Sequence, residues 1–479
     1  MHGLVVAANR LPVEVGGDDK FNTSPGGLAS ALSSVTAAGT HWVGWAGPDA
    51  PALKPFDHEA LRLHPVALSA DEVDRYYRGF ANAILWPLFH GRLRKVELNR
   101  AWWHSYRIVN RRFASAVARI APPGGTVWVH DYHLLMTPAM IRAKRPDLKV
   151  GLFLHIPFPN AQLFSMLPWR KEIIKGMLGA DVLGFQVAED VANFVTAAER
   201  LVDARTRGRM LFDGVHVVDV DAFPISVDFH HWNSLGEQAT SAAAENRDKV
   251  GGDSILLGID RLDYTKGISQ RLRAFGELLD EGRLDTEKCT FVQVAVPSRA
   301  DVAAYEDERE EVENLIAKVN ANHPRSDGSV PIVHTTTSLD EGEMAMWFRS
   351  ADALVVTSLA DGMNLVAKEF VAARRDLGGT LVLSEFAGAA HDLDGALIVN
   401  PYDIEAIKQA LVAAIEMPPA ERAARQKTMR AAVQHNDVHR WARNFLSRLQ
   451  SASPVRASDL ALRTDATNVV GSDTVRHLR

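Results

Sequence analysis

The sequence is poor in cysteine, in long apolar runs and in positive charge. Cys289 is the only cysteine among 479 residues, which excludes an internal disulfide framework and favours a reducing compartment. No apolar run approaches the ~20 residues of a membrane-spanning helix. The N-terminus lacks the basic segment of a signal peptide and leads directly into a strand-like stretch. We therefore expect a cytoplasmic protein that does not cross a membrane.

The charge balance limits the partners of this protein. The net charge is −6 at pH 7, with 53 Lys and Arg against 59 Asp and Glu, which argues against a general nucleic-acid binder. Any anion site must therefore be a local group of basic residues. The expected partners are small-molecule substrates, and we also expect a homo-oligomer, either a dimer or a tetramer.

The length and the pattern of the chain predict two α/β domains. A chain of 479 residues is long enough for two or three domains of ~100–200 residues. Short apolar strands alternate with helical stretches up to residue 228 and again from residue 254, which is typical of doubly wound sheets. Residues 230–253 are polar and weakly patterned. We predict two Rossmann-like domains facing across a cleft, 1–228 and 229–435, and a flexible tail at 452–479.

The segment Ser358–Phe370 is the most informative part of the second half. It follows the buried strand Ala353–Thr357 and contains a tight turn, Asp361-Gly362, before residues at helical spacing. A strand, a glycine turn and a helix start bring free backbone N–H groups and the positive end of a helix dipole together, which suits a diphosphate. Glu369, about one turn deeper, can bind a pair of ribose hydroxyls. The alternative is an ordinary turn between a strand and a helix.

Basic residues follow two other strands of the second half. Arg261 and Lys266 lie on one loop after the strand 254–259, where they can clamp a phosphate. The G-x-x-x-x-G-K-[ST] spacing of a P-loop is absent from this loop. Arg299 follows the strand 291–296. The alternative for all three residues is a solvated surface charge.

Polar groups also follow the strands of the first half, where ligands of open α/β sheets bind. Arg10 follows the strand that begins at Leu4, Asp131 follows the strand 126–129, and His155 lies between a strand and two prolines. Asp131 is a candidate to bind hydroxyls or to act as a base. A surface salt bridge for Arg10 and a structural hydrogen bond for His155 are the alternatives. Residues 130–133 alternate in direction, so we predict no metal site there.

Glycines and aromatic residues complete the candidate site in the first half. Gly26-Gly27 precedes a predicted helix and lets a ligand approach the backbone, although a plain loop is equally consistent. Residues 71–110 are rich in aromatic side chains, which either pack in the core or hold sugar rings. These are Tyr76, Tyr77, Phe80, Trp86, Phe89, Trp102, Trp103 and Tyr106.

Taken in order, these motifs resemble glycosyltransferase family 20, whose members are retaining enzymes with the GT-B fold. The resemblance covers roughly residues 3 to 450 and rests on long, specific motifs. The motifs are Asn9-Arg10, Gly26-Gly27-Leu28, Tyr76-Tyr77, Leu85-Trp86-Pro87, His130-Asp131-Tyr132-His133-Leu134-Leu135, His155-Ile156-Pro157-Phe158-Pro159, Arg261-Leu262-Asp263-Tyr264-Thr265-Lys266-Gly267, Ser298-Arg299, Asp361–Glu369 and Phe386-Ala387-Gly388-Ala389-Ala390.

The resemblance implies transfer of glucose from a nucleoside diphosphate glucose, with UDP, GDP or ADP, to C1 of glucose 6-phosphate. The product is α,α-trehalose 6-phosphate, formed without a metal or other cofactor. It implies that a helix near 436–450 crosses back onto the first domain. The implied donor contacts are Gly27, Arg261, Lys266, Asn364, Leu365 and Val366 at the diphosphate, Glu369 at the ribose, and His155 and Asp361 at the glucose. The implied acceptor contacts are Arg10, Tyr77, Trp86 and Arg299 at the phosphate end and Asp131 at the hydroxyls.

Among these, Asp131, His155, Arg261, Lys266 and Asp361 are the expected catalytic residues. The leaving phosphate is expected to take the acceptor's proton on the same face of the sugar. Three other functions remain open from the residues. They are a glycoside hydrolase with paired carboxyls ~5 Å apart, a related synthase that couples a different acceptor, and a non-catalytic regulator that binds sugar phosphate.

Overall fold

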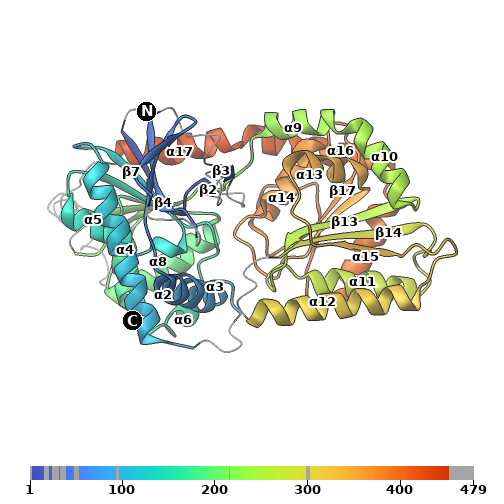
Figure 1. Cartoon of the computed structure of the whole chain (residues 1–479), viewed down its shortest axis with the longest axis horizontal. Helices are drawn as coiled ribbons and strands as arrows, with labels where there is room; N and C mark the ends of the chain where they lie inside the picture. The colour runs from blue at the N-terminus through green and yellow to red at the C-terminus, as the bar shows by residue number, and fades with distance from the viewer. Residues whose placement is uncertain are drawn as a thin grey trace, which may run out of the picture.

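The protein consists of two α/β lobes that lie side by side (Figure 1). The structure is a computed structural model, and it describes residues 3–15, 21–23, 32, 39–47, 53–92, 97–214, 216–297 and 303–452. The predicted tail from residue 453 onward lies outside the described residues. None of the helices in these ranges is both long enough and apolar enough to cross a bilayer.

The first lobe is built on a 10-stranded sheet in the order β10-β11-β12-β9-β8-β7-β1-β4-β6-β5. The strands from β12 to β6 are parallel, and antiparallel strands close both edges. Central strands are buried on both faces, which explains their continuous apolar runs. The strands are β1 Leu4–Arg10, β4 Thr40–Trp45, β5 Phe56–His58, β6 Leu61–Pro65, β7 Thr126–His130, β8 Lys149–Phe153, β9 Val182–Phe185, β10 Arg205–Arg207, β11 Met210–Phe212 and β12 Val217–Ala222, with the separate pair β2 Val13–Val15 and β3 Phe21–Thr23.

Helices cover both faces of this sheet (Figure 1). The aromatic segment forms η1, Val73–Leu85, which winds as a π-helix and buries Tyr76 and Phe80 completely. Such wide helices are rare and are frequently found at functional sites. The other helices are α2 Ala70–Glu72, α3 Trp86–Phe89, α4 Arg100–Ile120, η2 Tyr132–Leu134, α5 Thr137–Lys144, α6 Ala161–Phe164, α7 Arg170–Met177 and α8 Ala188–Val202.

The second lobe is built on a parallel 6-stranded sheet in the order β15-β14-β13-β16-β17-β18. Renumbered from β13, this is the 3-2-1-4-5-6 order of a dinucleotide-binding sheet. The strands are β13 Ser254–Arg261, β14 Cys289–Val296, β15 Ile332–Thr335, β16 Ala353–Val356, β17 Thr380–Ser384 and β18 Leu397–Val399. The helices are α9 Phe229–Gln238, α10 Thr240–Val250, α11 Ile268–Asp280, α12 Ala303–Asn322, α13 Glu341–Ser350, α14 Leu365–Ala373, η3 Gly388–His391, α15 Ile404–Glu416 and α16 Pro419–His435.

The polar, weakly patterned segment 230–253 is mostly helical. It forms α9 and α10, which belong to the second lobe. Helix α9 is anchored by Phe229 and Trp232, both 5% exposed, and the Trp232 ring lies 5.8 Å from that of Phe348. Asp228 caps the helix by accepting a hydrogen bond from the His231 N–H. The two helices bury four residues, Phe229, Trp232, Gly236 and Ala243, which are too few to produce a clear helical period in the sequence.

The last helix, α17 (Val438–Ser451), lies on the first sheet rather than on the second. Its Trp441 and Phe445 rings lie 4.9 and 5.0 Å from the ring of Trp128 in β7. Figure 1 shows this red helix beside the blue and cyan strands of the first lobe. The chain therefore crosses between the lobes twice, once before α9 and once before α17.

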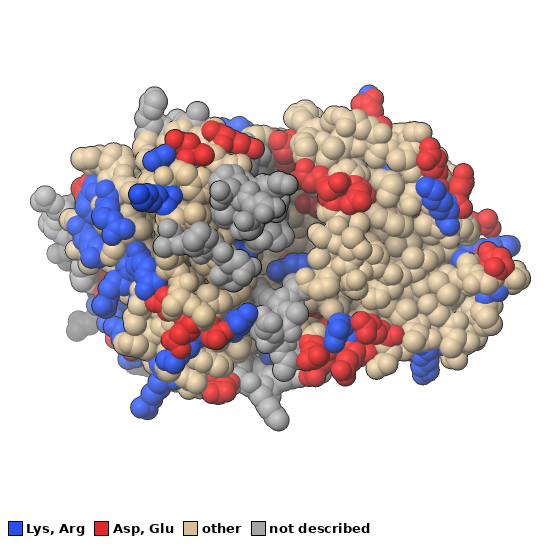
Figure 2. All heavy atoms as spheres, viewed as in Figure 1, with Lys and Arg blue, Asp and Glu red and all other residues tan. Residues whose placement is uncertain are grey.

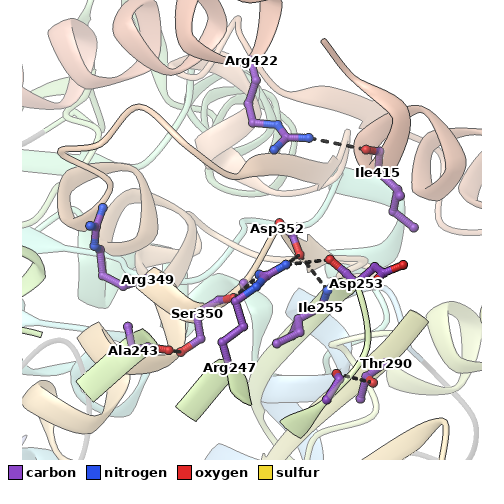
Figure 3. A network of polar contacts seen from close by, with 12 residues as sticks. Ala243, Arg247, Asp253, Ile255, Thr290, Arg349, Ser350, Asp352, Ile415 and Arg422 are labelled. Carbon is purple, nitrogen blue, oxygen red and sulfur yellow. Dashed lines mark hydrogen bonds and ion pairs between the residues drawn. The ribbon is translucent and has the colours of Figure 1, made fainter. Parts of the chain in front are cut away.

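A polar network joins the amino end of the second sheet to the helices beside it (Figure 3). Arg247 of α10 forms an ion pair with Asp352 at 2.8 Å and donates to the carbonyl oxygens of Ser350 and Asp253. Asp352 also accepts from the Ile255 N–H at 2.8 Å. These bonds join α10 to the start of β13 and the end of α13, so the network supports the sheet.

Candidate active site

The chain reverses strand order at one position in each sheet, between β1 and β7 and between β13 and β16. Ligands of open α/β sheets bind beyond the carboxyl ends of the strands at such a position. In the first lobe these strands lead into Arg10 and Asp131, and in the second into Arg261 and Ser358. The topology therefore places predicted ligand residues at both switch points.

A buried ion pair lies at the switch point of the second lobe. The Lys266 Nζ donates to Asp361 Oδ2 at 2.6 Å, with side chains only 12% and 14% exposed. The same oxygen accepts from Ser358 Oγ at 3.2 Å and from Asn364 Nδ2 at 3.1 Å. Burial acts to raise the pKa of Asp361, but Lys266 and Asn364 outweigh it and lower that pKa overall. Asp361 is therefore a carboxylate with low basicity.

Backbone bonds hold the loops around this ion pair together. The Leu359 N–H donates to the Thr265 carbonyl at 2.7 Å, and the Asp361 N–H donates to the Phe386 carbonyl at 3.0 Å. Gly267 has φ +61° and approaches Thr357 so closely that a Cβ would lie 2.0 Å from its carbonyl oxygen. Only glycine fits there, so the turn before α11 is set by close packing.

A second ion pair lies near the first, and its arginine is completely buried. Arg271 of α11 donates to Asp260 at 2.5 Å, and the two side chains are 0% and 3% exposed. Arg271 also donates to Gln293 at 2.9 Å, and Thr357 Oγ1 lies 3.4 Å away. Burial raises the pKa of Asp260 although Arg271 opposes that shift. The pair holds Asp260 in place near the end of β13, and the next residue, Arg261, is exposed.

The start of α14 supplies backbone donors. Asn364 has φ +79° and caps the helix by accepting from the Ala367 N–H at 3.0 Å. The first N–H groups of a helix have no partner within the helix, so those of Leu365 and Val366 are placed for an anion. The helix dipole adds partial positive charge at the same point.

Glu369 carries a buried carboxyl group on the same helix. Its Oε2 is buried without a hydrogen-bond partner among the described residues. Burial raises the pKa of Glu369 to about 8, and the carboxylate of Glu341 adds to the shift. A buried polar atom without a partner is uncommon in folded proteins. Paired hydroxyls of a ligand would provide the missing donors.

The first lobe presents an arginine against aromatic faces. The Arg10 guanidinium carbon lies 5.0 Å from the Trp45 ring centre and 5.6 Å from that of Tyr77. The Tyr77 ring in turn stacks on His133 at 5.7 Å. Aromatic faces attract a guanidinium and hold it in place while its N–H groups point along the plane. The arrangement suits the recognition of a phosphate.

Asp131 has a strained backbone. Its φ of +74° and ψ of 171° lie in a region that is nearly restricted to glycine, at a cost of about 1–3 kcal/mol. Its N–H donates to the Phe153 carbonyl at 2.7 Å, and its Oδ1 accepts from the His155 N–H at 3.2 Å. Strain of this kind is concentrated at functional sites. The two residues from neighbouring strand ends thus form one unit.

The lobes meet at this unit. A Cβ on Gly362 would lie 2.1 Å from the carbonyl oxygen of His155, so only glycine allows the second lobe to approach this closely. The Arg261 guanidinium carbon lies 5.6 Å from the Trp86 ring centre of the first lobe. Figure 2 shows the surface hollowed between the lobes, with basic side chains inside the hollow.

Contacts link several of the predicted site residues where the two lobes meet. Asp131 bonds to His155, Lys266 and Asn364 bond to Asp361, Arg10 lies against Tyr77, and Arg261 lies over Trp86. Leu365, Val366 and Glu369 lie on α14, directly after Asn364. Gly27 and Arg299 lie outside the described residues. Trp86 is only 5% exposed and lies under Arg261, so its predicted contact with an acceptor stays a prediction.

Three contributors are absent from the sequence-based prediction. Trp45 ends β4 beside β1 and stacks on Arg10, His130 contacts His155, and Arg271 supports Asp260. A polar or aromatic residue that ends a strand next to the switch point is a signal that could have identified Trp45 and His130. Arg271 has no such signal, because its partners are distant in the sequence.

This arrangement suits two anionic substrates in one cleft. The second lobe offers the Lys266 ammonium, the Arg261 guanidinium and backbone N–H groups. The first lobe offers the guanidinium of Arg10, which lies between aromatic rings, and groups that can bind hydroxyls. The described residues contain no group of three or more His, Cys, Asp or Glu side chains arranged to hold a metal. The positive charges of the protein can themselves stabilise a phosphate leaving group.

Comparison with known proteins identifies relatives over nearly the whole chain. The family model of glycosyltransferase family 20 matches residues 3–451. A trehalose-6-phosphate synthase of Mycobacterium sp. (strain KMS) is 46% identical, over 95% of this chain and 97% of that protein. Coverage of both chains excludes similarity through one shared domain alone.

Solved structures support the same grouping. The UDP-forming α,α-trehalose-phosphate synthase of Burkholderia xenovorans in complex with glucose 6-phosphate has a TM-score of 0.87 and 34% identity, and covers 94% of this chain and 100% of that one. A trehalose-6-phosphate protein of E. coli bound with UDP-2-fluoro glucose has a TM-score of 0.85 and 33% identity, with 94% and 100% coverage. The predicted GT-B fold with two parallel-stranded lobes is confirmed.

Proposed function

The chain belongs to glycosyltransferase family 20 and is a hexosyltransferase with trehalose-6-phosphate synthase activity, and we propose how its residues perform the transfer. The substrates in this proposal are a nucleoside diphosphate glucose and glucose 6-phosphate. The first lobe with α17, residues 1–228 and 436–450, holds the acceptor. The second lobe, residues 229–435, holds the donor.

The donor diphosphate binds between Arg261, Lys266 and the first N–H groups of α14. The Lys266 ammonium is already held at 2.6 Å from Asp361, so little side-chain freedom is lost when the phosphate arrives. The ribose hydroxyls donate to the Glu369 carboxylate, whose Oε2 lacks a partner in the described structure. Asp361 and His155 contact the hydroxyls of the transferred glucose. Gly27 lies beside the diphosphate.

The acceptor phosphate binds to Arg10, with Tyr77, Trp86 and Arg299 around it. Asp131 accepts a hydrogen bond from an acceptor hydroxyl. Because the backbone of Asp131 is strained (φ +74°), its carboxylate points in a different direction from that of a residue at an ordinary strand end. The close approach of Gly362 to His155 supports a position of the donor glucose next to the acceptor.

Transfer proceeds on one face of the donor glucose and retains its configuration. The bond between the glucose C1 and the phosphate oxygen breaks, and C1 bonds to the anomeric oxygen of the acceptor. The proton of that hydroxyl moves to the leaving phosphate. A covalent intermediate would need a basic carboxylate, but Asp361 accepts from Lys266, Ser358 and Asn364, and its pKa is lowered. Asp361 therefore serves as a ligand of the sugar.

One observation carries this proposal. The Lys266–Asp361 pair lies at the switch point of the second lobe, and the same loop contacts His155 of the first lobe through Gly362. Charge for a diphosphate and groups for a sugar therefore meet at one place. A hydrolase would have no use for the basic side of this cleft.

A transfer assay tests the proposal. The purified chain is incubated with glucose 6-phosphate and one donor at a time, which is UDP-, GDP- or ADP-glucose. The release of nucleoside diphosphate and the formation of the disaccharide phosphate are measured in each reaction. We expect both products with at least one donor, neither when an acceptor or donor is left out, and less than about a twofold change with EDTA, because protein cations stabilise the leaving group. Release of free glucose without glucose 6-phosphate would contradict transfer and favour hydrolysis.

The surroundings of the enzyme form a separate part of the proposal. We propose a cytoplasmic homo-oligomer, a dimer or a tetramer. The presence of one cysteine, Cys289, which is buried, supports this location. Light scattering on the purified chain would test the assembly, and the mass of a single chain, 52.6 kDa, would contradict it.

A further inference from the structure

His130 is a fully buried histidine at the edge of the candidate site. It ends β7, is 0% exposed and lies beside Trp128 at a ring distance of 4.5 Å. Its Nδ1 lies 3.0 Å from the Nε2 of His155, so the two rings share one hydrogen bond. None of the contacts described above for the donor or the acceptor uses His130. The proposed contacts with the two substrates therefore do not explain why a buried histidine lies at this position.

The direction of this hydrogen bond follows from the other nitrogen of His130. Its Nε2 is buried and has no hydrogen-bond partner in the described part of the chain. A neutral imidazole carries one N–H, and the second nitrogen accepts. Placing the hydrogen on Nε2 would bury an N–H group without a partner, and such groups are rarer than under-satisfied acceptors. The hydrogen therefore lies on Nδ1 and is donated to His155.

The remaining polar atoms of His155 are also engaged, with one exception. Its N–H donates to Asp131 Oδ1 at 3.2 Å, and its carbonyl oxygen accepts from Gln186 Nε2 at 3.4 Å. Because its Nε2 accepts from His130, the ring hydrogen of His155 must lie on Nδ1. His155 keeps partial exposure, and this N–H is the group it can offer to a ligand.

Both rings stay neutral at physiological pH. Burial lowers the pKa of His155 to about 3, and burial together with the neighbouring imidazole holds the pKa of His130 well below its usual value. Asp131 contacts the backbone of His155, and the rings of Phe153 and Trp441 lie 4.6 and 6.1 Å from the His155 ring. A neutral donor can bind a hydroxyl oxygen without repelling the cations on the opposite side of the cleft.

We propose that His130 is a positioning residue that fixes the Nδ1–H tautomer of His155 and thereby makes His155 a hydrogen-bond donor to a hydroxyl oxygen of the transferred glucose. This inference rests on the proposed function, because it assigns His155 to the donor sugar. A residue that sets the tautomer of its neighbour acts through orientation, as the partners of metal-bound or catalytic histidines do.

Two isosteric variants test the hydrogen bond. In His130→Asn, the side-chain amide can still donate a hydrogen bond from the position of Nδ1. In His130→Leu, the side chain has nearly the shape of asparagine but no hydrogen-bond donor. We expect kcat/KM for the nucleotide glucose to fall about tenfold in His130→Leu and less than about threefold in His130→Asn, as the loss of one buried hydrogen bond allows. The KM for glucose 6-phosphate should stay unchanged in both. Unfolding curves check that the two variants are equally folded.

Deoxy analogues of the donor identify the accepting oxygen. Each glucose hydroxyl is removed in turn, and the His130→Leu and wild-type enzymes are compared on each analogue. The loss caused by His130→Leu should disappear for one analogue only, because that donor lacks the oxygen that His155 contacts. An equal loss on every analogue would overturn the proposal, as would an equal loss in the Asn and Leu variants.

Histidine NMR gives a readout that does not depend on transfer. In the ¹⁵N-histidine-labelled protein, we expect the wild-type His155 to show a protonated Nδ1 and an accepting Nε2, and the pattern to change in His130→Leu but persist in His130→Asn. A protonated Nε2 on wild-type His155 would overturn the role of His130. Absence of transfer by the wild-type enzyme would overturn the proposed function instead, and the tautomer would still be decided by the spectrum.

Discussion

The two sides of the cleft hold their charges in different ways. On the second lobe, Lys266 and Arg271 are buried and paired with the carboxylates of Asp361 and Asp260. On the first lobe, Arg10 lies against the faces of Trp45 and Tyr77, and the buried histidines are neutral. Pairing buried charges compensates desolvation but makes each partner depend on the other. An aromatic face holds a cation without using its N–H donors.

This difference implies different sensitivities to mutation. Removing one partner of a buried pair leaves the other partner as an uncompensated charge. Replacing an arginine that lies against aromatic rings removes contacts but leaves no buried charge. The donor side should therefore show the larger effects on stability and turnover. The following predictions test that comparison, beginning with the largest expected effect.

Arg271→Met should reduce the free energy of unfolding by about 3–5 kcal/mol, because Asp260 remains buried without its counter-charge. Urea unfolding followed by circular dichroism measures the change. Arg273→Met, an exposed position on the same helix, is the matched control and should change stability by less than about 0.5 kcal/mol. Equal stability of the two variants would show that the buried pair contributes nothing, and the contrast between the lobes would fail. The addition of Asp260→Asn should recover part of the loss.

Lys266→Met should lower kcat/KM for the nucleotide glucose by about 10²–10³-fold, the effect of losing one group that stabilises developing charge. Arg261→Ala should act in the same direction, and it should leave the fold intact because this residue is exposed. Steady-state kinetics with Arg273→Met as the fully active control measure both. Near-normal turnover in either variant would reject the donor assignment.

Glu369→Gln should stabilise the protein in a pH-dependent way. Burial raises the folded-state pKa from 4.5 to about 8, so the folded state binds more protons than the unfolded state between these values and stability falls as pH rises. The variant should gain up to about 4 kcal/mol at pH 8 and much less near pH 4.5. Unfolding curves at both pH values, with the exposed Glu311→Gln as control, give the answer. A gain independent of pH would argue against a buried carboxyl.

The same Glu369→Gln variant separates stability from function. A neutral amide cannot accept from two ribose hydroxyls as a carboxylate does, so the KM for the nucleotide glucose should rise about tenfold at pH 8. The KM for glucose 6-phosphate should not change. An unchanged donor KM would reject the contact with the ribose.

Arg299→Ala should raise the KM for glucose 6-phosphate about tenfold, with a smaller effect on the donor, as expected for one charge-assisted contact to a phosphate. This residue lies outside the described part of the chain, so its role rests on the sequence motif. Initial rates at varied acceptor concentration test the assignment, and an unaltered acceptor KM would remove Arg299 from the site.

Arg10→Lys should have the smallest effect, a rise of about three- to tenfold in the KM for glucose 6-phosphate. The charge is kept, but the planar stacking on Trp45 and Tyr77 and the fork of donors are lost. Arg107→Lys, at an exposed arginine that also lies over a ring, Trp103 at 5.9 Å, is the control and should behave as wild type. A loss as large as that of Lys266→Met would show that the two sides are equally sensitive.

Sequence patterns were sufficient to predict which polar and charged residues lie at the ends of strands. Arg10, Asp131, His155, Arg261 and Ser358 all lie where a buried apolar strand stops, and this signal is local. The GT-B fold followed from the family motifs. The helices α9 and α10 were missed, because their few buried positions leave no clear period.

Contacts between side chains could not be predicted in this way. Lys266 and Asp361 are 95 positions apart and His130 and His155 are 25 apart, so no local pattern indicates that they touch. Both pairs appear because parallel strands end at one edge of a sheet. The positive φ of Asp131 and the winding of η1 also depend on surrounding packing that overrides local preference.

The sequence alone therefore determined the family, the order of the strands and loops, and the identity of the polar and charged groups at the strand ends. Those features depend on residue type and spacing along the chain. The tertiary structure decided which charges are paired, which are held by aromatic rings, and which nitrogen atoms of His130 and His155 lie together. These depend on burial and on distances between segments that meet only when both sheets have formed, since desolvation sets the balance between charged and neutral groups.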